Sequence, residues 1–289
     1  MMADGREAIA HLPSMDMGGK LQPGVRVLLR TATDKKGNPV GSEASGKYGT
    51  PRCEFIMQLL RCEEAENADS KGCWVGAHPS IGEKVSDALI KSGALTDELG
   101  GSEITEVKRE VSGVAGCDMR CDFLLGHADG TQTIVEVKTV VDTDYDPALH
   151  AAEPGARPKA VFLGRPEKTG GEYVRSAIFP WGQSKQLGPE GEKVVSARAI
   201  KHVRELTAVA DGRRTEAGVR LQAAVLFVIV RSDAVRFRAN DEACPSFARY
   251  IREARDAGVR VLAHRVSWGH EGDALGQAFH DGPIPMDFE

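Results

Sequence analysis

Three charged residues stand inside two otherwise apolar segments and could carry metal-dependent chemistry. Asp122 lies in the segment MRCDFLL, and Glu136 and Lys138 lie in TIVEVKTVV. Burying an unpaired charge is costly, so such segments are expected to direct these side chains at a cleft, a partner or a metal ion. Two carboxylates suit Mg²⁺ or Mn²⁺, which prefer oxygen ligands. We therefore expect Asp122 and Glu136 to bind the metal, and all three residues to catalyse phosphodiester hydrolysis.

The Glu-x-Lys pair has a second interpretation, an ordinary salt bridge on a strand. Residues two apart on a strand share a face, so Glu136 and Lys138 point the same way in either case. Asp122 joins them only if the loop between the two strands has an odd number of residues or the strands contain a bulge. A three-residue loop at 129–131 would place Lys138 opposite Asp122 and Glu136 on the diagonal. The apolar flanks of all three residues favour catalysis.

The pattern of apolar residues around these segments predicts an α/β protein. The expected strands span 25–30, 54–61, 73–76, 104–112, 119–125, 132–141, 221–230 and 259–266. The expected helices span 79–93, 195–210 and 246–257. The run at 221–230 is apolar throughout, which is typical of a central strand covered on both faces. Residues 141–174 are rich in Pro, Gly and Asp and predict a long loop or insertion.

Composition and charge narrow the class of protein. The sequence lacks both an apolar run of roughly 18 residues and a secretory signal, which predicts a soluble, cytoplasmic protein without membrane contact. Six scattered cysteines fit a reducing compartment. The net charge is −5, yet residues 198–265 contain 14 Lys and Arg against 8 Asp and Glu. That local excess suits phosphate binding, and a solvated helix face would give the same count.

Several segments resemble one known family. RCDFLL, IVEVKTV, ARAIKHVRELTAVA, AAVLFVIVRSDAVRF and AGVRVLAHRV are similar, in this order, to the sugar fermentation stimulation protein (SfsA) family. The resemblance implies an OB-like β-barrel followed by a PD-(D/E)xK (restriction-endonuclease-like) α/β domain. It also implies non-specific DNA binding and a link to sugar (maltose) metabolism. On this basis we expect an OB-like domain at 1–75, N-terminally incomplete, a nuclease-like domain at 76–275 and a tail at 276–289.

The resemblance also assigns site residues. Asp122 falls on the family's Arg-x-Asp, and Glu136 and Lys138 fall on its Glu-Val-Lys. The nucleic-acid-binding positions implied by the family correspond here to Arg120, Arg198, Lys201 and His202. The resemblance therefore implies a DNA-binding protein with a Mg²⁺-dependent or Mn²⁺-dependent nuclease site. The alternative is a non-catalytic DNA-binding regulator of sugar metabolism, and a homodimer is left open.

Overall fold

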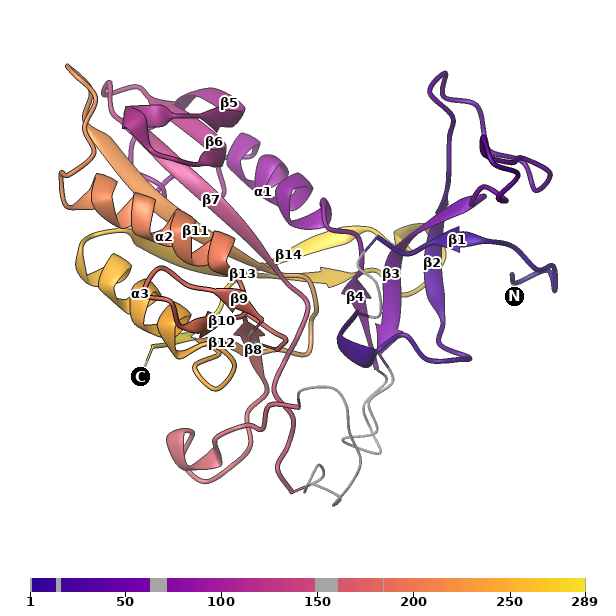
Figure 1. Cartoon of the computed structure of the whole chain (residues 1–289). Coiled ribbons are helices and arrows are strands. Elements are labelled where there is room, and N and C mark those ends of the chain that lie inside the picture. The colour runs from indigo at the N-terminus through magenta and orange to yellow at the C-terminus, as the bar shows by residue number, and fades with distance from the viewer. Residues whose placement is uncertain (1, 14–16, 63–71, 149–160, 184, 289) are drawn as a thin grey trace.

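The computed structural model describes residues 2–13, 17–62, 72–148, 161–183 and 185–288. A large six-stranded sheet flanked by helices forms the main body, and a smaller N-terminal sheet lies beside it (Figure 1). The large sheet has the strand order β14-β13-β11-β7-β6-β5. Its strands in chain order are β5 (Ile104–Ser112), β6 (Arg120–His127), β7 (Gln132–Val140), β11 (Leu221–Ile229), β13 (Arg260–Trp268) and β14 (Ala278–Pro283). The expected mixed α/β class is confirmed.

The large sheet combines a meander with a parallel core. β6 runs antiparallel to both of its neighbours, β5 and β7, whereas β7, β11 and β13 are parallel. Every residue of β11 from Ala223 to Ile229 is buried, as expected for the central apolar strand. This arrangement places β7, which carries the Glu-x-Lys pair, directly between the meander and the central strand.

Three helices cover the two faces of the large sheet. α1 (Ile81–Lys91) packs on one face, and α2 (Ala197–Ala210) and α3 (Pro245–Asp256) pack on the other (Figure 1). The buried side of α2 follows the expected helical spacing, because Ile200, Val203 and Leu206 are fully buried. The Ser196 hydroxyl accepts a hydrogen bond from the Ala199 N–H at 3.3 Å and caps the start of α2.

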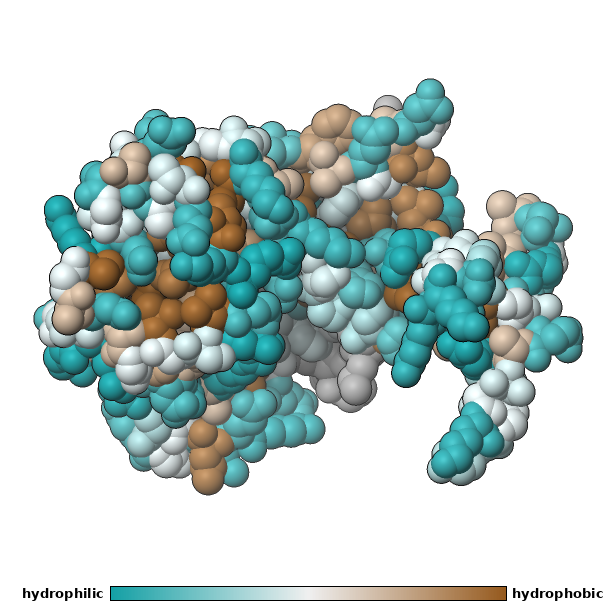
Figure 2. All heavy atoms as spheres, turned by 90° about the horizontal axis from the view of Figure 1, so that it is seen from above, coloured by the Kyte–Doolittle hydropathy of each residue, from teal (hydrophilic) through white to brown (hydrophobic). Residues whose placement is uncertain are grey.

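The N-terminal region forms a four-stranded sheet around β3. Its strands are β1 (Ala10–His11), β2 (Val27–Thr31), β3 (Phe55–Cys62) and β4 (Cys73–Gly76). Among the described residues this sheet does not close into a barrel, and its OB-like identity stays a prediction. Seen from above, this region stands off the main body, and its projecting parts carry mostly hydrophilic side chains (Figure 2).

The remaining elements lie at the edges of the fold. A parallel sheet has the order β15-β12-β8, and β9 pairs with β10 as a hairpin. These strands are β8 (Ser176–Phe179), β9 (Gln186–Leu187), β10 (Lys193–Val194), β12 (Arg236–Ala239) and β15 (Met286–Asp287). The 3-10 turns are Met17–Gly19, Val114–Gly116, Pro166–Lys168 and Gly272–Ala274.

Two expectations about connecting segments can be compared with the structure. Residues 276–289, expected as a tail, instead contribute β14 and β15 to two sheets. Part of the expected loop at 141–174 falls on residues 149–160, which lie outside the described residues. In the described part of the chain, no helix is both long and apolar enough to cross a membrane.

Candidate active site

Glu136 and Lys138 lie on β7 and face the side of the sheet that α2 covers. Ile134 and Val140, which have the same alternation along the strand, belong to the core that contains the buried residues of α2. Glu136 is only 2% exposed, and its Oε1 accepts a hydrogen bond from Lys138 Nζ. The second oxygen, Oε2, is buried and has no hydrogen-bond partner among the described residues. The sheet therefore holds an ionisable carboxylate with one oxygen uncommitted.

Asp122 shares this site, in a register that differs from the expected one. Phe123 pairs with Val135, so the next position places Asp122 opposite Glu136 and not opposite Lys138. The chain reverses earlier than expected, because His127 N–H donates to the Thr131 carbonyl at 2.9 Å and closes the loop at 128–130. The loop still has an odd number of residues, which keeps the carboxylates on a common face.

The backbone pairing between β6 and β7 ends next to Asp122. Beyond that point the Asp122 carboxylate forms a hydrogen bond to the backbone of β7. Asp122 Oδ2 accepts a hydrogen bond from the Val137 N–H at 2.6 Å, just past the last backbone pair between β6 and β7. This bond fixes the Asp122 side chain beside Glu136. A short charge-assisted bond of this kind stabilises the ionised carboxylate.

His202 reaches the same carboxylate from α2. Its Nδ1 lies 2.7 Å from Glu136 Oε1, and the residue is only 4% exposed. The sequence predicts His202 as a nucleic-acid-binding residue together with Arg198 and Lys201, but the structure buries it against the sheet. The cause is tertiary: position 202 turns toward the sheet, where the buried Glu136 offers the imidazole a hydrogen-bond partner that no core hydrocarbon could provide.

The four residues expected to contact nucleic acid line one cavity of about 750 Å³ beside this site. Arg198 is exposed, Arg120 Nη2 lies 2.6 Å from Glu110 Oε2, and Lys201 Nζ lies 2.6 Å from Asp118 Oδ2. His202 lies at the inner end of this cavity. The two ion pairs are exposed, and such pairs contribute little stability, so a phosphate could replace either carboxylate at small cost.

Two further carboxylates belong to the site, and neither was predicted. Glu83 in the first turn of α1 and Glu110 on β5 place one oxygen each within 4.8 Å of an Asp122 oxygen and of each other. Both also contact cations, because Glu83 lies 3.6 Å from Arg109 and Glu110 lies near Arg120. The three carboxylates form a group of hard oxygen ligands of the kind that divalent cations prefer.

Asp122 lies beside Glu136, which faces α2, and also near Glu83 of α1, which covers the other face of the sheet. An irregularity in β6 accompanies this arrangement. Phe123 packs against the side covered by α1, whereas Cys121, two residues away, packs against the side covered by α2. Regular alternation would put both on one face. Glu110, with a φ of 54°, stands next to this change on the neighbouring strand β5. Next to this change, Asp122 places an oxygen within 4.8 Å of oxygens of Glu83 and Glu110.

The electrostatics of the two central carboxylates differ. Burial and the neighbouring Glu136 charge raise the pKa of Asp122 to about 6, against the opposing effect of the Val137 hydrogen bond. Burial acts in the same direction on Glu136, but the His202 hydrogen bond and the Lys138 charge outweigh it and hold the pKa of Glu136 below its ordinary value. Glu136 is therefore ionised at neutral pH, whereas the pKa of Asp122, about 6, lies close to neutral pH.

Asp122→Asn is expected to stabilise the metal-free protein at pH 7.5 by about 1 to 2 kcal/mol, after discounting for solvent screening. Because its pKa is raised on folding, the carboxyl contributes stability below about pH 4 that is lost as pH rises through about 6. The gain from Asn should therefore vanish near pH 4, which urea unfolding at both pH values would measure.

Asp129→Asn provides a contrast of opposite sign. The Thr131 hydroxyl and backbone N–H hold the pKa of Asp129 below its ordinary value, so its carboxylate contributes stability above about pH 4. Its replacement should therefore destabilise the protein at pH 7.5. An Asp122→Asn variant that is no more stable than the wild type at pH 7.5 would contradict the assigned burial of that charge.

The chain is similar in sequence to proteins of one known family. Residues 193–272 match the family model described as the sugar fermentation stimulation protein RE domain. A homologue from Thioalkalivibrio sulfidiphilus is 30% identical over 263 residues, covering 90% of this chain and 79% of that protein. One from Syntrophotalea carbinolica is 28% identical over 268 residues, covering 92% and 82%. Both carry the description sugar fermentation stimulation protein homolog.

A solved structure shows the same fold. The Pyrococcus furiosus SfsA protein in complex with Ca²⁺ superposes with a TM-score of 0.58 at 18% identity, covering 98% of this chain and 87% of that one. The extent of the match to the homologues, together with this common fold, identifies the family. The chain belongs to the sugar fermentation stimulation protein (SfsA) family.

Proposed function

We propose that this protein binds DNA and hydrolyses its phosphodiester bonds at the Asp122–Glu136–Lys138 site with Mg²⁺ or Mn²⁺. The observation that carries the proposal is the hydrogen bonding of the buried Glu136 carboxylate. Its Oε1 is held by Lys138 and His202, and among the residues that the structure describes its buried Oε2 has no hydrogen-bond partner. A buried oxygen of an ionised carboxylate normally has a partner, and a metal ion would provide one.

The residues present fit such an ion. Asp122 and Glu136 would bind it, and Glu83 and Glu110 lie close enough to Asp122 to add ligands or to hold metal-bound water. All of these donors are oxygens, which favours Mg²⁺, Mn²⁺ or Ca²⁺ over zinc. The archaeal relative described in complex with Ca²⁺ supports a divalent cation in this family.

The protein groups around the ion suit phosphoryl chemistry. A bound divalent ion would activate water and neutralise the charge that develops on the phosphate. Lys138 Nζ, held by Glu136, would orient the attacking water or stabilise the pentacovalent phosphorus. Arg120, Arg198 and Lys201 in the adjoining cavity would hold the DNA backbone.

The finer structural assignments belong to the same proposal. The antiparallel β6–β7 pair followed by parallel β11, with Glu-x-Lys on β7, supports a PD-(D/E)xK nuclease core. We assign the N-terminal sheet to an OB-like domain on the family resemblance. A cytoplasmic location, the domain division at residues 75 and 76 and a homodimer remain predictions.

The test is cleavage of single- and double-stranded DNA by the purified protein with Mg²⁺, Mn²⁺ or EDTA. We expect cutting with either metal and none with EDTA. Lys138→Met should lower the rate about 10²-fold, because it removes one preorganised cation from the transition state. Lys91→Met, at an exposed position on α1, serves as the control and should cut at the wild-type rate.

Two results would count against a nuclease. Equal rates for Lys138→Met and the wild type would remove Lys138 from the chemistry. A pure wild-type protein that binds DNA but does not cut it with either metal would instead favour the non-catalytic regulator of sugar metabolism.

A further inference from the structure

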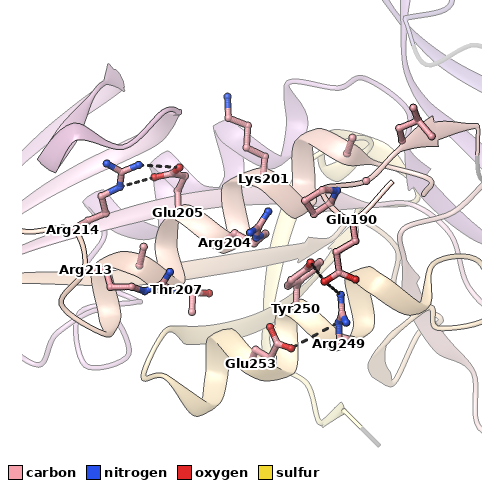
Figure 3. A pocket seen from close by; sticks show the side chains of 15 residues that line it. Glu190, Lys201, Arg204, Glu205, Thr207, Arg213, Arg214, Arg249, Tyr250 and Glu253 are labelled. Carbon is pink, nitrogen blue, oxygen red and sulfur yellow. Dashed lines mark hydrogen bonds and ion pairs between the residues drawn. The ribbon is translucent and has the colours of Figure 1, made fainter. Parts of the chain in front are cut away.

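A second, larger groove of about 860 Å³ lies farther along α2. Its walls are α2, α3, the turn between β9 and β10, and the segment that follows α2 (Figure 3). Ala197 and Lys201 line both this groove and the cavity beside the candidate active site. The groove is therefore an extension of that cavity along the helix, and none of the catalytic residues proposed above lies in it.

The walls of this groove, here called the α2–α3 groove, carry an excess of positive charge. Five cations face three carboxylates there. The cations are Lys201, Arg204, Arg213, Arg214 and Arg249, and the carboxylates are Glu190, Glu205 and Glu253. None of these charges belongs to the proposed metal site, and only Lys201 also lines the adjoining cavity. A groove with charged walls is poorly suited to an apolar partner and well suited to an anionic one.

Arg204 is the cation best placed to receive a ligand. Its guanidinium lies 5.4 Å from the centre of the Tyr250 ring, and that of Arg249 lies 4.7 Å from the same ring. Glu190 is committed to Arg249 at 2.7 Å and to the Tyr250 hydroxyl at 3.0 Å (Figure 3). Arg204 itself has no ion pair with any residue that the structure describes. Two guanidinium groups thus share the Tyr250 ring, and of the two only Arg249 is paired with Glu190.

We propose that the α2–α3 groove binds the phosphate backbone of the DNA strand that extends away from the active site. This inference rests on the proposed function and adds the path of the substrate. The groove and the cavity together follow α2 from Ala197 to Ala208, about 16 Å at 1.5 Å per residue. At about 3.4 Å per nucleotide, that length accommodates about five phosphates of one strand. Arginine suits this role because its planar guanidinium donates two parallel hydrogen bonds to a phosphate.

The test is the binding of fluorescent single-stranded oligothymidylates of 2 and 15 nucleotides, with Ca²⁺ in place of Mg²⁺. Arg204→Gln removes the charge and leaves a shorter polar side chain at this position. For the 15-mer we expect the dissociation constant to rise about tenfold and the salt slope to fall by about 0.7. The dinucleotide fills only the cavity, whose α2 residues from Ala197 to His202 span about two nucleotides, and should bind as it does to the wild type. Arg213→Gln, at a highly exposed groove position, should weaken 15-mer binding in the same direction.

Arg255→Gln is the matched control, because Arg255 lies on α3 outside the groove and loses the same charge. Its binding of both oligonucleotides should equal that of the wild type. If the wild type binds the 15-mer and both groove variants bind it equally well, the groove proposal is wrong while the proposed function stands. If the wild type binds neither oligonucleotide, the DNA-binding function fails, and the groove proposal fails with it.

Discussion

Glu136→Gln is expected to lower metal-dependent DNA cleavage by at least about 10³-fold, more than any other single change in the site. Glu136 combines two tasks that the other residues do not share. Its Oε1 holds both Lys138 and His202, and its Oε2 is the buried oxygen available to a metal ion. The neutral Gln side chain is a weaker metal ligand than the Glu136 carboxylate. Its NH₂ group also cannot accept a hydrogen bond from Lys138 or His202. Single-turnover cleavage rates at saturating Mn²⁺ would measure the loss.

Metal binding should be lost together with cleavage. Wild-type protein is expected to gain thermal stability with millimolar Mn²⁺, and Glu136→Gln should show little or no gain. Glu106→Gln removes a carboxylate from an exposed position on β5 and is the control for the change in net charge. A Glu136→Gln variant that keeps both the Mn²⁺-dependent stabilisation and the cleavage rate would exclude Glu136 from the site.

Local patterns in the sequence were sufficient to predict the main elements of the large sheet. The apolar run at 221–230 became the buried strand β11, and the helical spacing of Ile200, Val203 and Leu206 became the buried side of α2. These patterns can be recognised locally because the apolar residues that an element buries follow the period of that helix or strand. The charged residues on apolar strands, Asp122 and Glu136, were recognisable for the same reason: a charge in such a segment needs a partner.

The register of the β6–β7 pair could not be predicted from the same patterns. A loop at 128–130 and a loop at 129–131 have the same odd length, and both keep Asp122 on the face of Glu136. Only the hydrogen bond from His127 to Thr131 distinguishes the two. The sequence therefore indicated which residues share a face, but not which of them lie opposite one another.

Contacts between distant elements were the other part that sequence patterns left out. Glu83 and Glu110 come from a helix and a strand that precede Asp122 in the chain, and the fold brings them within 4.8 Å of its carboxylate. His202 read as part of a basic helix face, and its burial depends on a carboxylate 66 residues earlier in the chain. No local spacing reports such contacts, because they are decided by how the elements pack.

A buried ion pair where β4 meets the large sheet leads to the second large expected effect. Arg231 is fully buried, and Asp233 accepts hydrogen bonds from its Nε and its Nη2, each at 2.6 Å. Val75 on β4 forms an isolated bridge with Arg231, and the Gly76 N–H donates to the Val230 carbonyl at 2.9 Å. Asp233→Ala leaves a buried guanidinium without its carboxylate, which should reduce the free energy of unfolding by about 3 to 5 kcal/mol at pH 7.

The pH dependence separates this effect from a simple loss of packing. Burial would raise the pKa of Asp233, but the Arg231 charge outweighs burial and holds that pKa far below its ordinary value. A lowered pKa contributes stability above about pH 4 that is lost as pH falls toward the folded value. The difference in the free energy of unfolding between Asp233→Ala and the wild type should therefore shrink between pH 7 and pH 3 in urea unfolding.

Asp256→Ala, at a highly exposed ion pair, is the control and should change stability by less than about 0.5 kcal/mol at both pH values. An Asp233→Ala cost that is independent of pH would mean that packing, and not the ion pair, stabilises this junction.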